Sequence, residues 1–159
     1  MITKILDNLR IIIVCLAFYF GYSIGFRNGF DPNAQLHFMI PIIIVAIAGI
    51  SGIEGLFLGR QTAQAKGFEF GSNYQRQSAI ALLSYAAIAI VVYFVNWGIK
   101  AELTLFFAFM FFLIFSAVNH AMDAIKNRNY AWQNINRPFI TLMLIIGMIY
   151  PVVMALKTL

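Results

Sequence analysis

A histidine and a carboxylate lie one helical turn apart at the end of an apolar run. Residues 103–118 are almost wholly Phe, Leu, Ile, Ala and Met, and Asn119, His120 and Asp123 follow them. Residues three and four apart are neighbours on a helix, so Asp123 can contact both Asn119 and His120. A carboxylate fixes the tautomer of an imidazole and raises its basicity, which suits a proton carrier or a group that orients a ligand. The same residues can also form a polar helix end that satisfies the last carbonyls. The sequence leaves both interpretations open.

An acidic residue interrupts the second apolar run. Glu54 lies within "AIAGISGIEGLFLG", shortly before Arg60. An ionisable side chain inside a membrane span costs roughly 2.5–3.5 kcal/mol on insertion scales and usually faces the bundle interior. We therefore expect Glu54 to have a basic partner, and Arg76 and Arg137 are candidates by depth. A structural ion pair and a functional carboxylate both fit this pattern.

Polar residues also crowd the start of the third apolar run, in "GSNYQRQSA". The first amide groups of a helix attract anions, and the topology derived below brings this segment to the same membrane face as His120 and Glu54. The sequence predicts one polar pocket with an apolar floor at that face. Its nine residues would be Glu54, Arg60, Asn73, Gln75, Arg76, Asn119, His120, Asp123 and Arg137. Such a pocket suits an amphipathic ligand with an anionic head, although a plain polar collar fits the same residues.

The composition predicts the elements that must position these side chains. Of the 159 residues, 62% are apolar and 11% charged, against about 45–50% and about 25% in soluble domains, so much of the apolar excess must face lipid. Five apolar segments approach the roughly 20 residues that cross a bilayer as a helix, and their continuous apolarity favours helices over barrel strands. They are residues 9–26, 38–58, 78–97, 103–118 and 139–156. The predicted fold is an all-α integral membrane protein, a single bundle of five (or four) transmembrane helices over residues 1–159.

The basic residues predict the orientation of the bundle. Eight of the eleven lysines and arginines fall in the N-terminal segment and in the second and fourth connections, which share one face when five segments span. By the positive-inside rule the N-terminus is cytoplasmic and the C-terminus external, as in a multi-pass inner-membrane protein. The formal charge of +5 therefore reflects topology, and no nucleic-acid partner is predicted. Cys15 is the single cysteine and excludes both an intrachain disulfide and cysteine-rich metal sites.

Small residues predict close contacts between helices. Ala17, Gly21 and Gly25 recur every fourth residue, and a second series, Ala48, Gly52, Gly55 and Gly59, lies on one face of the next segment. Small residues let helix backbones approach closely in lipid. Either the first two helices pack on each other, or one series is an oligomer contact. The phenylalanines that surround residues 103–118 favour that helix as the lipid-facing perimeter.

These motifs resemble a family of small bacterial membrane proteins. The resemblance rests on "KGFEFGSNYQRQSAIALL", "VNHAMDAIKNRN" and "NRPF", and it covers roughly residues 50–150. The family pattern has a Gly-aromatic turn, a Ser-Pro-Phe-Gln-like helix start and a later His. Tyr74 and Gln75 match the Phe-Gln pair, Asn73 replaces the Pro, and His120 matches the His. The family is classed only as a domain of unknown function with four or five helices, so the resemblance implies a fold and no activity.

A weaker likeness is to the membrane-associated proteins of eicosanoid and glutathione metabolism, which are small helical trimers that bind glutathione through Glu, Arg and Asn. Glu54, Arg60 and Arg76 are of matching types and depth, but the characteristic Glu-Arg…Asn…Glu run of that family is not reproduced. The likeness therefore transfers no activity to this chain.

Three functions fit these observations. The favoured one is a non-catalytic protein that binds an amphipathic or anionic ligand at the cytoplasm-facing pocket, or acts as an accessory subunit of a homo-oligomer or membrane complex. The second is a membrane enzyme on a lipid-like or glutathione-type substrate, with His120 as base and Arg76 as anion clamp. The third is a small proton-coupled transporter that uses Glu54 and His120. No cofactor and no catalytic or metal-ligating set is assigned.

Overall fold

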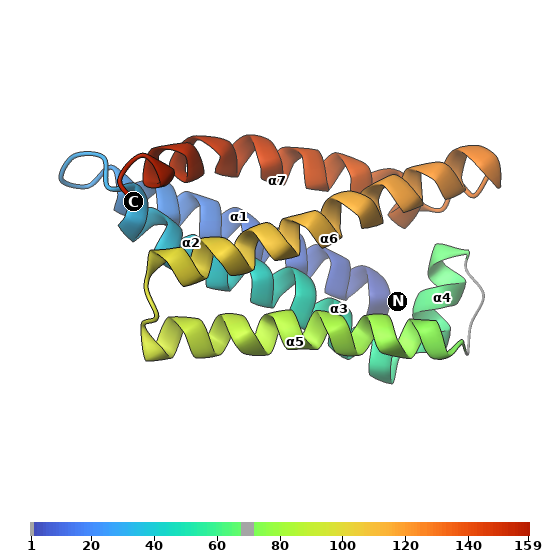
Figure 1. Ribbon diagram of the computed structural model, residues 1–159. Helices are drawn as coiled ribbons and strands as arrows, with labels where there is room; N and C mark the ends of the chain where they lie inside the picture. The colour runs from blue at the N-terminus through green and yellow to red at the C-terminus, as the bar shows by residue number, and fades with distance from the viewer. Residues whose placement is uncertain (1, 68–71) are drawn as a thin grey trace.

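The computed structural model describes residues 2–67 and 72–159, and every regular element in these residues is a helix. Figure 1 shows the arrangement. The elements are α1 (Ile2–Gly25), α2 (Pro32–Ile44), the π-helical turn η1 (Val45–Gly49), α3 (Ile50–Phe57), α4 (Gly59–Lys66), α5 (Asn73–Val95), α6 (Ile99–Lys126) and α7 (Trp132–Leu156).

Five helical stretches are long and apolar enough to cross a membrane, which confirms the predicted all-α membrane fold. They are Ile2–Gly25, Pro32–Phe57, Asn73–Val95, Ile99–Lys126 and Asn134–Leu156. The second of these joins α2, η1 and α3. Each stretch begins before the predicted apolar run, and α6 also continues past the end of its run to Lys126, because the polar residues there continue the same helical hydrogen bonding. The helix α4 lies in a stretch that we expected to be a connection.

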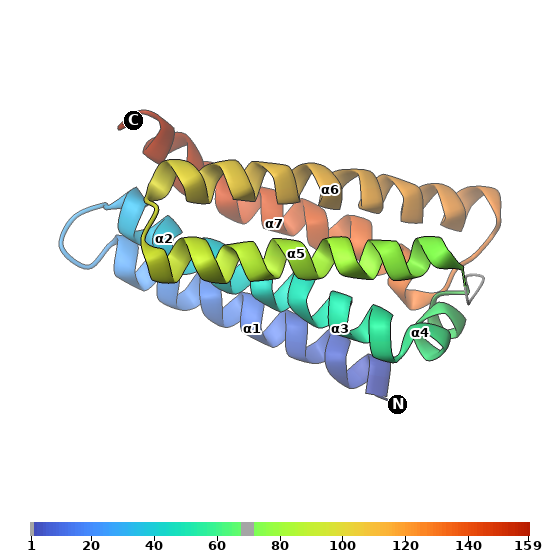
Figure 2. The same ribbon diagram turned by 60° about the horizontal axis from the view of Figure 1, so that its bottom comes forward.

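The second stretch is the centre of the bundle and the most buried of the five. The helix α1 packs on α2, α5 packs along η1 and α3, and α6 packs between α2 and α7. Figures 1 and 2 show the two chain termini at opposite ends of the bundle, as five crossings require. The start of α1, the end of α3, the end of α6 and the start of α7 therefore share one end.

Local signals fix several helix boundaries. The Asp31 carboxylate accepts hydrogen bonds from the backbone N–H groups of Asn33 and Ala34, and Pro32 begins α2, as expected for an N-cap followed by a proline that needs no donor. Ser72 caps α5 by accepting a bond from the Gln75 N–H. These caps set where α2 and α5 enter the bundle.

Both predicted glycine series lie inside the fold. A Cβ added at Gly21 would collide with the Met39 side chain, so the first series packs on α2, as predicted. The second series packs on α5 instead of α1: a Cβ at Gly52 would lie 2.6 Å from Leu83 Cγ, and one at Gly55 2.8 Å from Ala79 Cβ. Both series thus bring helix backbones together within one chain.

The assignment of residues 103–118 to the lipid-facing perimeter was wrong. Phe109 is fully buried and Phe106 nearly so, whereas Phe107, Phe111 and Phe115 are exposed. The helix α6 therefore has a core face and a lipid face that are equally apolar, which is why composition could not separate them.

Candidate functional site

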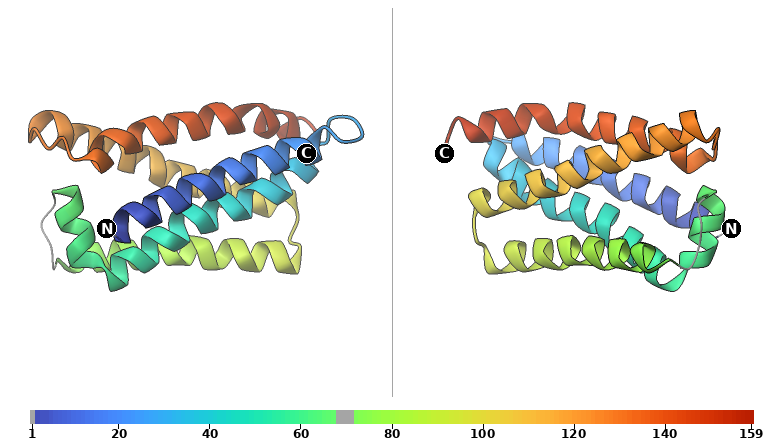
Figure 3. Two further views of the ribbon diagram at one scale, coloured as in Figure 1. Left: turned by 180° about the vertical axis from the view of Figure 1, so that it is seen from behind. Right: turned by 45° about the vertical axis from the view of Figure 1, so that its right-hand side comes forward.

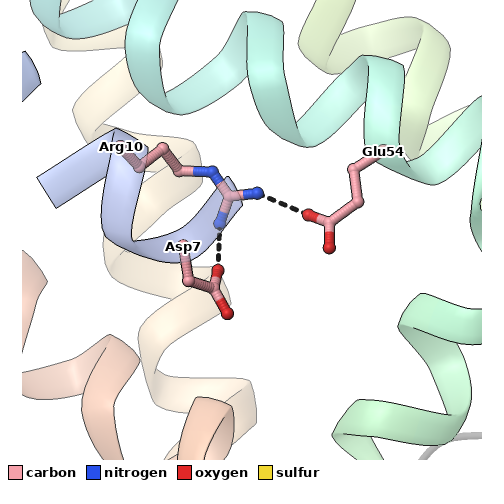
Figure 4. A network of polar contacts seen from close by, with 3 residues as sticks. All are labelled: Asp7, Arg10 and Glu54. Atoms are coloured by element: carbon pink, nitrogen blue, oxygen red, sulfur yellow. Dashed lines mark hydrogen bonds and ion pairs between the residues drawn. The ribbon is translucent and has the colours of Figure 1, made fainter. Parts of the chain in front are cut away.

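A buried ion-pair cluster joins α1 to α3. The Arg10 guanidinium donates from Nη1 to Asp7 Oδ1 at 2.5 Å and from Nη2 to Glu54 Oε2, as Figure 4 shows. Glu54 is 2% exposed and Arg10 9%, so both charges are held out of solvent. Glu54 thus has the basic partner that the sequence requires, but the partner is Arg10 and not Arg76 or Arg137. The Arg10 Nε atom is buried and has no hydrogen-bond partner within the described residues.

A π-helical turn precedes Glu54 in the chain. The π-helical turn η1 (Val45–Gly49) lies directly before α3 in the second span, and the extra residue in such a turn rotates all later side chains about the helix axis. Ile47 on this turn and Ser51 at the start of α3 both line the cavity described next. The irregular turn therefore shapes the wall of the site and places Glu54 toward α1.

A cavity of about 510 Å³ lies between α1, α6 and α7. Figure 3 (left) shows α1 and α7 close together near the C-terminus and diverging toward the end where α1 begins. At the close end the Tyr22 hydroxyl donates to the Gly147 carbonyl at 2.8 Å, and the Phe30 and Tyr150 rings lie 4.9 Å apart. The cavity fills the wedge beyond these contacts.

The lining of this cavity changes along its length. Its deeper wall is apolar and includes Val14, Cys15, Phe18, Leu113 and Leu144. Its polar end carries Asp7, Arg10, Trp132, Asn136 and Arg137. A slot with an apolar wall and a few polar groups at one end is the usual form of a small-molecule site, and its volume falls in the usual range of about 300–1,000 Å³.

The charges at the polar end are unequally engaged. Arg10 is held by two carboxylates. Arg137 interacts electrostatically with Asp7, Arg10 and Glu54. It makes no hydrogen bond or ion pair in the part of the chain that the structure describes. Glu54 is not in the lining, so the cavity wall itself carries two arginines and one carboxylate. The Arg137 guanidinium, with its five donors, is therefore available to an acceptor inside the cavity.

The histidine motif forms a separate polar network between α6 and α7. Asn134 is fully buried and links the two predicted residues: its Oδ1 accepts from His120 Nδ1 at 2.7 Å, and its Nδ2 donates to Asp123 Oδ2 at 3.0 Å. Asp123 also accepts from the amides of Asn127 and Asn129, at 2.7 and 2.6 Å. This network ties the end of α6 to the start of α7. His120 and Asp123 are not among the residues that line the cavity.

The other predicted pocket residues lie on the surface of the same end. Arg60, Asn73, Arg76 and Asn119 are exposed. Gln75 is half-buried and donates from Nε2 to the Gly59 carbonyl at 2.6 Å, which fastens the start of α5 to α4. Of the nine predicted residues, only Arg137 lines the cavity, and Glu54 reaches it through Arg10.

Sequence reasoning missed a second buried carboxylate at the opposite end of the bundle. Glu102 in α6 is 2% exposed; its Oε1 lies 2.5 Å from His37 Nδ1, and the His37 ring stacks on Tyr93 with 4.8 Å between centroids. Because "GIKAE" read as a short connection, Glu102 was not expected inside a helix that begins at Ile99.

The comparisons with known proteins place the chain in a family. A model of a family of unknown function, DUF6790, matches residues 8–158, and the chain belongs to this family. Neither the curated proteins nor the solved structures give a match. The likeness to the proteins of eicosanoid and glutathione metabolism therefore stays a prediction.

Proposed function

We propose that this protein binds an amphiphile taken from the bilayer, without catalysis, in the cavity between α1, α6 and α7. The observation that carries the proposal is the cavity itself, which is apolar over most of its length and ends at Arg10 and Arg137. An apolar tail would lie along Val14, Cys15 and Leu144, while the head would meet the uncommitted donors of Arg137.

The donors at the polar end favour a head group rich in acceptor oxygens. Arg137 lines the cavity and has no hydrogen-bond partner within the described residues, whereas Arg10 Nε, also without a partner there, has almost no accessible surface. Guanidinium groups match carboxylate and phosphate geometry, and a buried donor without an acceptor costs about 1–3 kcal/mol. A carboxylate or phosphate oxygen in the cavity would give the Arg137 guanidinium an acceptor.

The geometry gives less support to the enzyme alternative. Its proposed base, His120, donates through Nδ1 to the buried Asn134 and does not line the cavity. Its proposed anion clamp, Arg76, is exposed at the start of α5. The two residues named for catalysis therefore lie outside the cavity between α1, α6 and α7.

We also propose that the cavity's polar end faces the cytoplasm in an inner membrane. Lys4 and Arg10 of α1, and Arg60 in α4, lie at this end of the bundle, where the positive-inside rule places the cytoplasm. A reporter fused after Leu159 should then behave as external.

Native mass spectrometry of the protein released from nanodiscs tests the binding. We expect a retained small molecule on the native protein and on Arg76→Gln, which changes an exposed arginine outside the cavity. We expect its loss from Arg137→Gln, with an unchanged helical circular dichroism spectrum. Equal retention by the two variants would mean that the molecule is bound elsewhere.

A further inference from the structure

The proposed ligand can be narrowed by the size, depth and charge of the cavity. Resting on the function proposed above, we propose that the occupant is an amphiphile with one acyl chain and a singly charged anionic head, which enters from the bilayer between α1 and α7. Each of these three properties follows from a different feature of the site.

The size and the single polar end of the cavity favour a ligand with one chain. The cavity has a volume of about 510 Å³ and one polar end, at Arg10 and Arg137, and its volume is that of an ordinary small-molecule site, about 300–1,000 Å³. A fatty acid of ordinary length is a ligand of that size class. A phospholipid with two chains and a glycerol head is far larger and would leave most of its apolar surface outside.

The depth of the cavity matches one leaflet. Its lining on α1 runs from Asp7 to Phe18, which is about 16 Å at 1.5 Å per residue. Half of a hydrocarbon core about 30 Å thick is about 15 Å. A lipid tail with its head beside Arg10 and Arg137 would therefore end near the middle of the bilayer, where Phe18 and Gly147 close the cavity.

The route of entry follows from the side wall. Ile11 and Cys15 on α1, and Phe139 and Met143 on α7, line the cavity and are all exposed. The cavity is therefore open toward lipid between α1 and α7. An acyl chain can enter it laterally from the bilayer without crossing the aqueous phase.

The charges favour a single negative charge on the head. Arg137 is the one cation of the lining that is not already paired within the described residues, and Asp7 lies at the same end. A monoanionic head would neutralise Arg137, whereas a second negative charge would face the Asp7 carboxylate. A cationic head would meet two arginines and be repelled.

Photocrosslinking in nanodiscs tests this inference. The probe is a hexadecanoate that carries a diazirine in its chain, and labelled residues are mapped by mass spectrometry. We expect saturable labelling of α1 and α7 positions that line the cavity, such as Cys15 and Leu144, and non-saturable labelling of the lipid-facing Phe111. Unlabelled hexadecanoate should compete, hexadecyltrimethylammonium should not, and Arg137→Gln should weaken competition at least about tenfold.

A cavity-filling variant and its matched control test the position of the acyl chain. Val14→Phe puts bulk into the cavity, whereas Ile12→Phe makes a similar change on the lipid-facing side of α1. We expect Val14→Phe to shift the best competitor from hexadecanoate to dodecanoate and Ile12→Phe to change nothing. If Val14→Phe does not fold, Ser116→Phe on the α6 wall serves instead.

The outcomes separate the two proposals. Competition by dioleoyl phosphatidic acid but not by hexadecanoate would overturn the single-chain inference and leave amphiphile binding standing. If hexadecyltrimethylammonium competed as well as hexadecanoate, the inference that the ligand has an anionic head would be overturned. Labelling of Cys15 and Leu144 no stronger or more saturable than that of Phe111 would overturn both proposals.

Discussion

Replacing Glu54 by glutamine should destabilise the protein by about 3 kcal/mol. The change keeps the shape of the side chain but removes the charge that holds Arg10, which is 9% exposed and cannot reach water easily. Removing one partner of a buried ion pair typically costs about 3–5 kcal/mol. Asp7 still contacts Arg10 at 2.5 Å and is partly accessible, so we expect the lower end of that range.

A double-mutant cycle isolates the pair from the effect of each substitution. Glu54→Gln, Arg10→Gln and the double variant are unfolded reversibly by a denaturing detergent in mixed micelles. The double variant lacks both charges of the Arg10–Glu54 pair, and the Asp7 carboxylate that remains is partly accessible, so the loss should fall short of the sum of the single losses by about 1–3 kcal/mol. Arg76→Gln, at an exposed site, should stay within about 0.5 kcal/mol of the native protein. Additive losses, with a coupling below about 0.5 kcal/mol, would refute the view that this pair joins the two helices.

The remaining predictions concern packing and the network at the ends of α6 and α7. Gly52→Ala should destabilise by about 1–3 kcal/mol, because the new Cβ would lie 2.9 Å from the Ala79 carbonyl oxygen; Gly49→Ala, whose Cβ would meet Ala86 Cβ at 3.4 Å, should be tolerated, and equal melting temperatures for the two would contradict this packing. Phe109→Ala should cost about 3–5 kcal/mol and the exposed Phe107→Ala much less, as measured by unfolding in micelles; the reverse order would restore α6 to the perimeter. Asn134→Leu should speed backbone hydrogen exchange over residues 120–134 without reducing ligand retention, since Asn134 ties α6 to α7 outside the cavity; loss of the ligand would make this network part of the site.

The sequence predicts the membrane fold well because long apolar runs must be helical in lipid. It also predicts that Glu54 faces inward and is paired, since an unpaired carboxylate in a span is too costly. Both inferences follow from the cost of placing polar groups in lipid and not from knowing which residues contact each other. The sequence of a single chain is therefore sufficient to make them.

The partner of Glu54 could not be read from the sequence. Because the first apolar run was placed from residue 9, Arg10 was counted with the basic residues before that run, but α1 begins at Ile2 and Arg10 lies about two turns inside the helix. The π-helical turn before α3 also has no signature in the run of Ile, Val and Ala that contains it. The direction in which the Glu54 side chain points therefore depends on a local irregularity of the backbone.

The cavity was beyond prediction for a related reason. Its wall consists of Val, Ile, Leu and Phe that look the same as residues facing lipid or core, because all three environments are apolar. The sequence predicted that Arg137 belongs to the site. It did not predict that α1 forms the opposite wall of the cavity. The cavity exists because α1 and α7 diverge, and divergence depends on contacts such as Tyr22 to Gly147 between residues far apart in the chain.

The most direct test of the central proposal is an experimental structure of the protein in nanodiscs made with native lipid. We predict elongated density between α1 and α7 that begins beside Arg137, follows Cys15 and Leu144, and ends near Phe18. A structure in which α1 closes on α7 along its whole length, with lipid density only on the outer faces of the bundle, would contradict it.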